Sequence, residues 1–130
     1  MNLVAQYTPS ISGKILCPGD KSISQRAVII GSLLNEDIEI SGFLNGEDPI
    51  STANALNAIG SSIKINGTSV SIKKRDIPFK DPSVNVDLGN SGTGMRLMMG
   101  LISSLGIKAC LLYTSPSPRD RSLSRMPSSA

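Results

Sequence analysis

Apolar residues recur at helical spacing in three stretches of the chain. Such spacing places them on one side of an amphipathic helix, so helices are predicted over about residues 21–34, 48–59 and 93–105. Gly60 and Gly106 follow the second and third stretches, where a glycine commonly ends a helix. The side chains expected to face the core are Ile23, Ala27, Ile30, Leu33 and Leu34 in the first helix, Ala53, Leu56 and Ile59 in the second, and Leu97, Met98, Leu101 and Ile102 in the third.

Between these stretches, apolar and polar residues alternate with the period of a strand. The clearest case is Ser62–Ile65 and Ser69–Ile72 around Asn66-Gly67, because this dipeptide readily takes the positive φ angles of a tight turn. The pattern therefore predicts a β-hairpin. Shorter strands are expected at residues 3–7, 12–17, 38–40 and 84–88 and from residue 107, with a polar, proline-bounded connector at residues 73–82.

One glycine-containing turn occurs twice, each time directly before a predicted helix. Gly19–Arg26 aligns with Gly89–Arg96 at an offset of 70 residues, so that glycine falls on glycine and arginine on arginine. The order strand, helix, strand, helix, hairpin is thus one unit of about 70 residues that starts again in the second half of the chain. This repetition predicts an α/β (α+β) fold.

Both turns carry residues that suit an anion. The N-terminus of a helix presents unpaired N–H groups and about half a positive charge. Lys21 and Arg26 add full charges at the first helix, and Ser22 adds a neutral donor. The second turn offers Asn90, and Gly92 has no Cβ to block a ligand. We therefore expect two anionic groups; the alternatives are a capped surface helix with solvated charges and a glycine turn that serves packing.

The helix ends admit more than one interpretation. Asp20 could be the N-cap of the first helix, or Ser22 and Gln25 could form a capping box. Glu47 and Asp48 precede the body of the second helix, where acidic residues complement the helix dipole and cap its N–H groups.

The charge of the chain does not favour a nucleic-acid partner. The formal net charge is +3, but residues 110–130 contribute most of it, which leaves no basic patch on the rest of the chain. Lys73-Lys74-Arg75 is expected to be a solvated charge run. Arg96 could either face a ligand or pair with Asp87.

Composition excludes several kinds of site. The chain has no histidine, so a zinc site or a Ser-His-Asp triad is not expected. Two Phe, two Tyr and no Trp mean that the core is aliphatic. No apolar run is long enough to span a membrane, the first residues lack the pattern of a signal peptide, and Cys17 and Cys110 show no metal-type spacing. These features predict a cytoplasmic protein without a metal.

The last residues break the pattern of the repeat. From Tyr113 to Ala130, nine of eighteen residues are Ser or Pro, and no apolar period remains. Such a segment buries too little apolar surface to offset its ordering entropy. The amino-acid sequence of this segment is typical of a translated cloning adaptor, and residues 112–130 are expected to be a disordered tail outside the fold.

The two turns resemble signature sequences of the 5-enolpyruvylshikimate-3-phosphate synthase (3-phosphoshikimate 1-carboxyvinyltransferase) family. The matching stretches are Pro18–Ala27 and Leu88–Leu97, within a resemblance that runs from about Val4 to Leu111. It implies the inverted-prism fold of two lobes built from repeated βαβαββ units. Residues 1–18 would be strands of the lobe completed by a C-terminal half, and residues 19–111 the first unit and part of the second unit of the other lobe.

The resemblance also implies an activity. Enzymes of this family transfer the enolpyruvyl group from phosphoenolpyruvate to the 5-hydroxyl of shikimate 3-phosphate, on the shikimate pathway to aromatic amino acids, without cofactor or metal. By matching positions, Lys21 would be catalytic and touch both substrates. Ser22 and Arg26 would hold shikimate 3-phosphate, and Asn90 and Gly92 would contact phosphoenolpyruvate.

The chain is shorter than members of this family, which implies an N-terminal fragment that is inactive alone, from an enzyme that acts as a monomer. Two alternatives remain open. One is an enolpyruvyl transferase acting on UDP-N-acetylglucosamine, which has Lys-Asn where this chain has Lys21-Ser22. The other is a non-catalytic phosphate-binding module.

Overall fold

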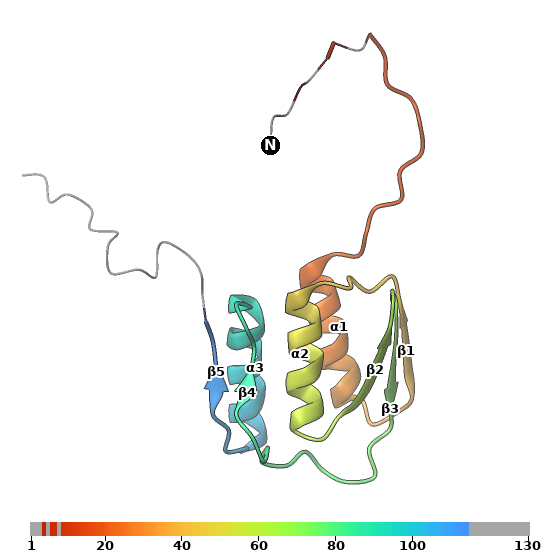
Figure 1. Ribbon diagram of the computed structural model, residues 1–130. Coiled ribbons are helices and arrows are strands. Elements are labelled where there is room, and N and C mark those ends of the chain that lie inside the picture. The colour runs from red at the N-terminus through yellow and green to blue at the C-terminus, as the bar shows by residue number, and fades with distance from the viewer. Residues whose placement is uncertain (1–3, 5, 8, 115–130) are drawn as a thin grey trace, which may run out of the picture.

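The computed structural model describes residue 4, residues 6–7 and residues 9–114 (Figure 1). Helices and strands alternate through this part of the chain, which confirms the predicted mixed α/β class. The elements are α1 (Lys21–Leu33), β1 (Ile38–Ser41), α2 (Glu47–Ala58), β2 (Ser62–Asn66), β3 (Ser69–Lys73), β4 (Val86–Asp87), α3 (Gly92–Leu105) and β5 (Leu111–Leu112).

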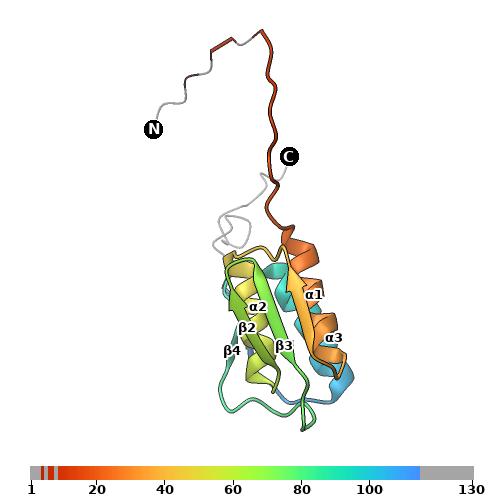
Figure 2. The same cartoon turned by 90° about the vertical axis from the view of Figure 1, so that its right-hand side faces the viewer.

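The elements form layers. An antiparallel sheet in the order β1-β3-β2 makes one outer face, and α1 and α2 lie side by side against it (Figures 1 and 2). α3 packs on the side of α2 that faces away from this sheet, next to the short pair β4–β5. The predicted hairpin is confirmed, since Asn66 pairs with Ser69 and Gly67 has a φ of +60°.

The second repeat starts as the first one suggests. β4 and β5 are parallel, with Val86 opposite Leu111, and α3 connects them. α1 followed by β1 is the corresponding helix and strand of the first repeat. The structure therefore contains one helix–strand–helix–hairpin unit and the strand–helix–strand beginning of the next.

The hydrophobic core lies between the sheet and the helices and continues to α3. It is almost entirely aliphatic, as the composition predicts, with Phe43 as its one fully buried aromatic among the described residues. The predicted inward residues of α2 and most of those of α3 are buried. The largest fully buried apolar side chains are Phe43, Leu56, Ile59, Leu88, Met98, Val28, Val70 and Val86.

The predicted buried face of α1 is wrong. Ile23 and Ile30 are 69% and 56% exposed, and Leu33 and Leu34 are exposed as well. The face that packs inward instead carries Ser24, Gln25, Val28, Gly31 and Ser32. At Gly31 this face approaches the sheet closely, because a Cβ there would lie 2.7 Å from Ile72 Cδ1.

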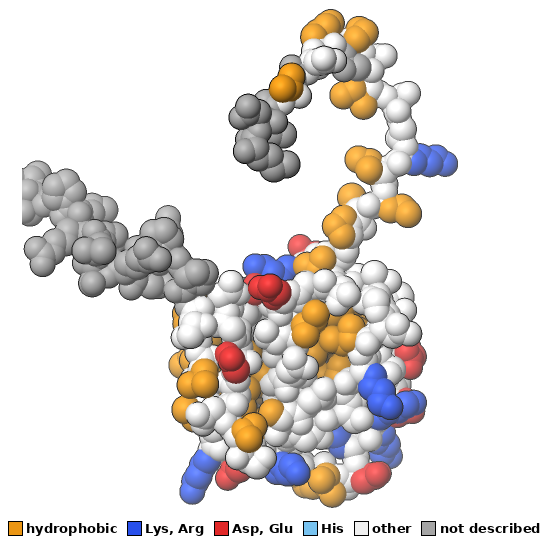
Figure 3. All heavy atoms as spheres, in the orientation of Figure 1, with side chains coloured by type: hydrophobic (Ala, Val, Ile, Leu, Met, Phe, Trp, Pro, Cys, Tyr) orange, Lys and Arg blue, Asp and Glu red, His pale blue; other side chains and the backbone are white. Residues whose placement is uncertain are grey.

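The segment before α1 does not form the predicted strand at residues 12–17. The described residues from 9 to 20 have no regular structure, and Ile15 and Leu16 are 91% and 99% exposed. Figure 3 shows apolar side chains along this extended segment, which leaves the body of the molecule. A strand needs a neighbour for its N–H and C=O groups, and no such neighbour lies beside residues 12–17 in the described part of the chain. The predicted strand at residues 3–7 is likewise not formed by residues 4, 6 and 7, which have no regular structure, while residues 3 and 5 lie outside the described residues.

The C-terminal boundary lies later than the sequence indicates. Leu112 belongs to β5 and its carbonyl accepts from Leu88 N at 3.0 Å, while Thr114 N donates to Gly89 O at 2.8 Å. Residues 112–114 are therefore part of the fold, because the strand pairing with β4 extends through them. Residues 115–130 lie outside the described residues.

Candidate functional site

All three helices begin at the same end of the molecule. In Figure 1, α1, α2 and α3 run parallel, and each starts at the upper end. Their unpaired N–H groups and the positive ends of their dipoles therefore gather on one face. Such a face suits anions, and the two glycine-containing turns, before α1 and before α3, both lie on it.

The start of α1 is fixed by its own cap and by the loop after β1. Asp20 is the N-cap, and its carboxylate accepts from Ile23 N at 2.8 Å, so the capping-box alternative is wrong. Ser24 Oγ accepts from Leu44 N at 2.9 Å. A Cβ on Gly19 would lie 2.2 Å from Gly42 O, so only glycine allows the chain to enter α1 at this place.

Lys21 lies at the first turn of α1 and pairs with the first turn of α2. Its Nζ is 3.0 Å from Asp48 Oδ2, and the two side chains are 54% and 17% exposed. Asp48 therefore does more than complement the helix dipole, because its carboxylate holds the ammonium group at the shared N-terminal end. The sequence showed only an acidic residue in a first turn, and nothing in it indicated this partner.

Ser22 and Arg26 lie on the same stretch of α1. Ser22 is half-buried, and its carbonyl accepts from Arg26 Nη1 at 3.1 Å. The Arg26 guanidinium is exposed and has no ion-pair partner among the described residues, so its charge is available to a ligand at this end.

The turn before α3 is closed by its own hydrogen bonds. Gly89 has a φ of +55°, which favours glycine, and its N–H donates to Asp87 Oδ1 at 2.8 Å. Ser91 is the buried N-cap, and Gly92 N donates to Asn90 O at 3.0 Å. These N–H groups are used within the turn, so the Asn90 side chain and nearby cations are the groups left for a ligand.

The second predicted role of Arg96, an ion pair with Asp87, is not found in the described residues. Neither of the two ion pairs in the described residues includes Arg96, and the Asp87 carboxylate is engaged by the turn instead. Arg96 Nη1 lies 3.6 Å from the place of a Cβ on Gly92, and Tyr113 Oη lies 3.3 Å from it. The space beside Gly92 is therefore bordered by a guanidinium and a phenol.

The two predicted sites adjoin one another. Gln25 of α1 is fully buried, and its Nε2 donates to Ser91 Oγ, the N-cap of α3, at 2.8 Å. The structure thus brings together the α1 turn, with Lys21, and the turn before α3, across 66 positions of sequence. Sequence reasoning missed Gln25, because an amide inside an amphipathic helix gives no signal of its partners.

Polar contacts elsewhere serve the fold. Lys73 Nζ lies 2.8 Å from Asp37 Oδ2, which lowers the pKa of Asp37 and raises that of Lys73 through the hydrogen bond between them. Arg75 is not solvated as predicted: its Nη1 donates to Ser32 O, and its guanidinium stacks 3.7 Å above the Phe79 ring. The bond to Ser32 O attaches the connector to the C-terminal end of α1, and the stack on Phe79 lies within the connector itself.

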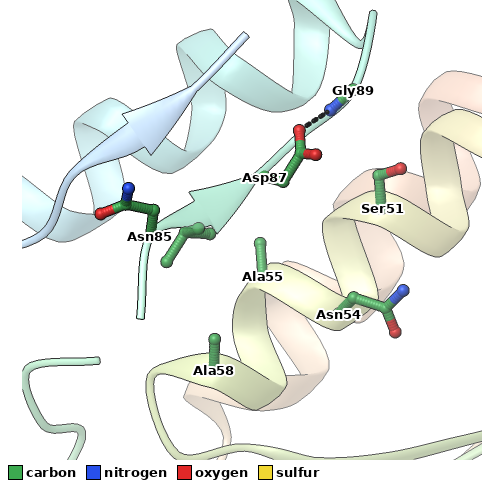
Figure 4. Close-up of a pocket in the computed structure, with 8 residues that line it drawn as sticks. Ser51, Asn54, Ala55, Ala58, Asn85, Asp87 and Gly89 are labelled. Carbon is green, nitrogen blue, oxygen red and sulfur yellow. Dashed lines mark hydrogen bonds between the residues drawn. The ribbon is translucent and has the colours of Figure 1, made fainter. Parts of the chain in front are cut away.

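A cavity of about 380 Å³ opens between α2 and β4 (Figure 4). Its lining comes from α2 (Ser51, Asn54, Ala55 and Ala58) and from the segment of β4 (Asn85, Val86, Asp87 and Gly89). No Lys or Arg lines it, and Asp87 adds a negative charge, so it does not suit a phosphorylated anion.

Within the described residues, none of the helices has the length and apolar character of a membrane span. The same residues contain no group of three or more His, Cys, Asp or Glu side chains that could hold a metal ion.

Comparisons with known proteins agree with the two turns. The family model described as EPSP synthase (3-phosphoshikimate 1-carboxyvinyltransferase) matches residues 6–121. The 3-phosphoshikimate 1-carboxyvinyltransferase of Ruthia magnifica is 42% identical over 95% of this chain, and that of Petrotoga mobilis is 42% identical over 97%. This chain covers 27% and 29% of those two relatives, so it spans about a quarter of their length.

A solved structure shows the same fold. The EPSP synthase from Acinetobacter baumannii superposes with a TM-score of 0.64 at 38% identity, over 70% of this chain and 21% of that chain. The matched sequences, the repeated glycine turns and the superposed fold all lead to one conclusion. The chain belongs to the EPSP synthase (3-phosphoshikimate 1-carboxyvinyltransferase) family.

Proposed function

We propose that this chain is the N-terminal part of an enzyme that transfers the enolpyruvyl group of phosphoenolpyruvate to the 5-hydroxyl of shikimate 3-phosphate. The products are 5-enolpyruvylshikimate 3-phosphate and phosphate. The observation that carries the proposal is the convergence of two glycine turns and of Lys21 at one end of three parallel helices. Both substrates are phosphorylated carboxylates, and a cationic helix end suits such groups.

The proposed roles follow from the charges at this end. Lys21, whose ammonium lies between α1 and α2, contacts both substrates. Ser22 and Arg26 hold shikimate 3-phosphate, for which the unpaired Arg26 guanidinium offers a bidentate donor. Asn90 and Gly92 contact phosphoenolpyruvate beside Arg96, whose Nη1 lies near Gly92. The reaction proposed here uses no cofactor.

The chemistry is an addition followed by an elimination. The 5-hydroxyl gives up its proton as its oxygen bonds to C2 of phosphoenolpyruvate and C3 takes up a proton. The resulting tetrahedral adduct then loses one of its C3 protons and inorganic phosphate, which restores the C2–C3 double bond. Cations that neutralise the phosphate and carboxylate charges stabilise this adduct. Lys21 and Arg26 supply such cations, and groups outside this chain supply the proton transfers. We therefore propose that this chain alone is inactive.

The surface of α1 supports a larger protein. Ile23, Ile30 and Leu34 form an apolar stripe on α1 that is exposed, although such stripes are normally buried. We propose that further βαβαββ units of the same lobe cover it. The exposed apolar residues before α1 agree with residues 1–18 joining a second lobe, and residues 19–111 then form the beginning of the first.

A titration tests the proposed binding site. Phosphoenolpyruvate and shikimate 3-phosphate are added separately to the chain labelled with ¹⁵N, and backbone amide shifts are followed by NMR. We expect saturable shifts at Gly89–Gly92 and at the first turn of α1, and their loss in Lys21→Ala. Lys74→Ala is the matched control, because Lys74 is an exposed lysine next to the connector and away from this site.

The same titration separates the competing functions. Stronger binding of UDP-N-acetylglucosamine than of shikimate 3-phosphate would overturn the proposed acceptor. Phosphate release from the two substrates by the chain alone would contradict its proposed inactivity. Binding of inorganic phosphate with no preference for either substrate would favour a non-catalytic phosphate-binding module.

We further propose that the whole enzyme acts in the cytoplasm as a monomer. The absence of a membrane-spanning helix in the described residues agrees with the first part. Sedimentation of the chain joined to its natural continuation, at several concentrations, tests the second part, and a concentration-dependent mass would contradict it.

A further inference from the structure

One buried amide connects the three helices at their N-terminal ends. Gln25 of α1 has no exposed surface. Its Nε2 lies 2.8 Å from Ser91 Oγ at the start of α3, 3.0 Å from Thr52 Oγ1 of α2, and 3.4 Å from Asp48 O of α2. No other side chain of the described residues donates to groups on two other helices.

The partners of Gln25 determine which way its amide points. Asp48 O can only accept, and Thr52 Oγ1 donates its proton to this carbonyl at 3.0 Å. Both groups therefore present lone pairs to Gln25, and they require its NH₂ group rather than its carbonyl. The two NH₂ protons serve the two shorter contacts, Thr52 Oγ1 at 3.0 Å and Ser91 Oγ at 2.8 Å, and Asp48 O at 3.4 Å can only share one of them, so Ser91 Oγ accepts from Gln25 Nε2.

Ser91 passes this constraint on to the glycine turn. Its Oγ also accepts from Gly94 N at 3.1 Å, which is the capping bond of α3. A Cβ on Gly94 would lie 2.7 Å from Ser91 Oγ and 2.9 Å from Thr52 Oγ1, so the junction has no free space. The turn cannot shift unless these bonds break.

Burial of the Gln25 side-chain amide costs free energy of folding, and packing alone does not explain why a glutamine is present. Gln25 Oε1 is buried and has no hydrogen-bond partner among the described residues. An unpaired buried acceptor is unfavourable, and a methionine of similar volume would avoid it. A glutamine at this place is therefore best explained by the hydrogen bonds that its NH₂ group donates.

We propose that Gln25 is a positioning residue, which holds the Ser91 cap and thereby sets the Gly89–Gly92 turn beside Lys21. This inference rests on the proposed function, since it concerns how the two halves of the proposed anion site are aligned. Gln25 is buried and acts through Ser91 rather than through contact with a substrate.

Hydrogen exchange of the 130-residue chain tests the positioning without a ligand. In Gln25→Met, exchange of the Gly94 amide is expected to be roughly tenfold faster, because its acceptor Ser91 Oγ loses its support. The Ile63 amide, which donates to Asn57 Oδ1 at 2.8 Å far from the junction, reports general destabilisation. Thr52→Val is the matched control, because it removes another acceptor of Gln25 but leaves the bond to Ser91.

The Ile63 amide and the Thr52→Val variant distinguish a positioning role of Gln25 from a merely structural one. If Gly94 and Ile63 exchange faster by the same factor in Gln25→Met, or if Thr52→Val affects Gly94 as strongly, the proposal is overturned. If Gln25→Met does not fold, the proposal can still be tested on the unmodified chain. Its Gln25 NH₂ protons are expected to exchange slowly with water, and rapid exchange would contradict the proposal.

A second measurement distinguishes this inference from the proposed function. If phosphoenolpyruvate shifts no amide of the unmodified chain, the proposed function fails, whereas the Gly94 exchange still reports on Gln25. If phosphoenolpyruvate binds, its affinity is expected to fall about tenfold in Gln25→Met and to be little changed in Thr52→Val. An unchanged affinity in Gln25→Met would refute the alignment role.

Discussion

Truncation of two apolar residues in α1 distinguishes the structure from the hydrophobic pattern. Ile30 is larger than Val28, so hydrophobicity alone predicts that Ile30→Ala is the more destabilising change. In the structure, Val28 is fully buried and Ile30 is 56% exposed. The order of the two effects is therefore expected to be reversed in this chain.

The magnitudes follow from the buried groups. Val28→Ala removes two buried carbon groups and leaves a cavity, which costs about 2 kcal/mol of unfolding free energy. Ile30→Ala removes three groups that are only partly buried, which costs about 1 kcal/mol. The higher helix propensity of alanine offsets a similar few tenths of a kcal/mol in both variants, so the expected difference between them is about 1 kcal/mol.

Urea unfolding followed by circular dichroism measures both variants under the same conditions. A larger loss for Ile30→Ala than for Val28→Ala would show that the stripe is buried in solution, against the structure. With the natural continuation of the chain attached, Ile30→Ala is expected to become the more costly change, because further units of the lobe would cover the stripe. An unchanged cost there would argue against the proposed lobe.

Three further changes test the site and the fold. Gly94→Ala places a Cβ 2.7 Å from the hydroxyl of the α3 cap, so it is expected to lower the unfolding free energy by about 1–3 kcal/mol, and an unchanged urea midpoint would contradict this. Asp48→Asn releases Lys21 from its ion pair, so binding of phosphoenolpyruvate is expected to strengthen by roughly two- to fivefold in the NMR titration; weaker binding would show that the pair is needed as it stands. The hydrogen bond from Lys73 lowers the pKa of Asp37 below its ordinary value of 3.8. The pair therefore stabilises the fold at pH values above 3.8, and this stabilisation is lost as the pH falls through the pKa that Asp37 has in the folded chain. The urea midpoint of Asp37→Asn is therefore expected to fall less in acid than that of the unmodified chain, and parallel pH profiles would refute this assignment.

The helices and the hairpin could be predicted closely because their signals are local. α1 was expected at about residues 21–34 and spans Lys21–Leu33, where Asp20 caps its start. Gly106 ends α3 with a φ of +67°, and Asn66-Gly67 turns the hairpin. Each feature depends on the φ angle or the capping side chain of one or two residues, and the identity of those residues can be taken directly from the sequence.

The site could be predicted only in part. Both glycine turns were identified, because a turn before a helix is a local pattern that repeats at a fixed offset. The partner of Lys21 on α2 and the role of Gln25 were not, since each contact joins residues 27 and 66 positions apart. The solvated state predicted for Arg75 failed for the same reason, because its acceptor lies at the end of α1.

The sequence by itself thus determined where the helices begin and end, where the hairpin turns, and which two turns can attract anions. Only the tertiary structure decided which side of α1 is buried and how the two turns face one another. Helical periodicity shows that a stripe is apolar but not what covers it, and the face of α1 that packs inward carries Gln25, Val28 and Gly31 instead. Such choices depend on distances between elements, and these are set only when the elements pack together.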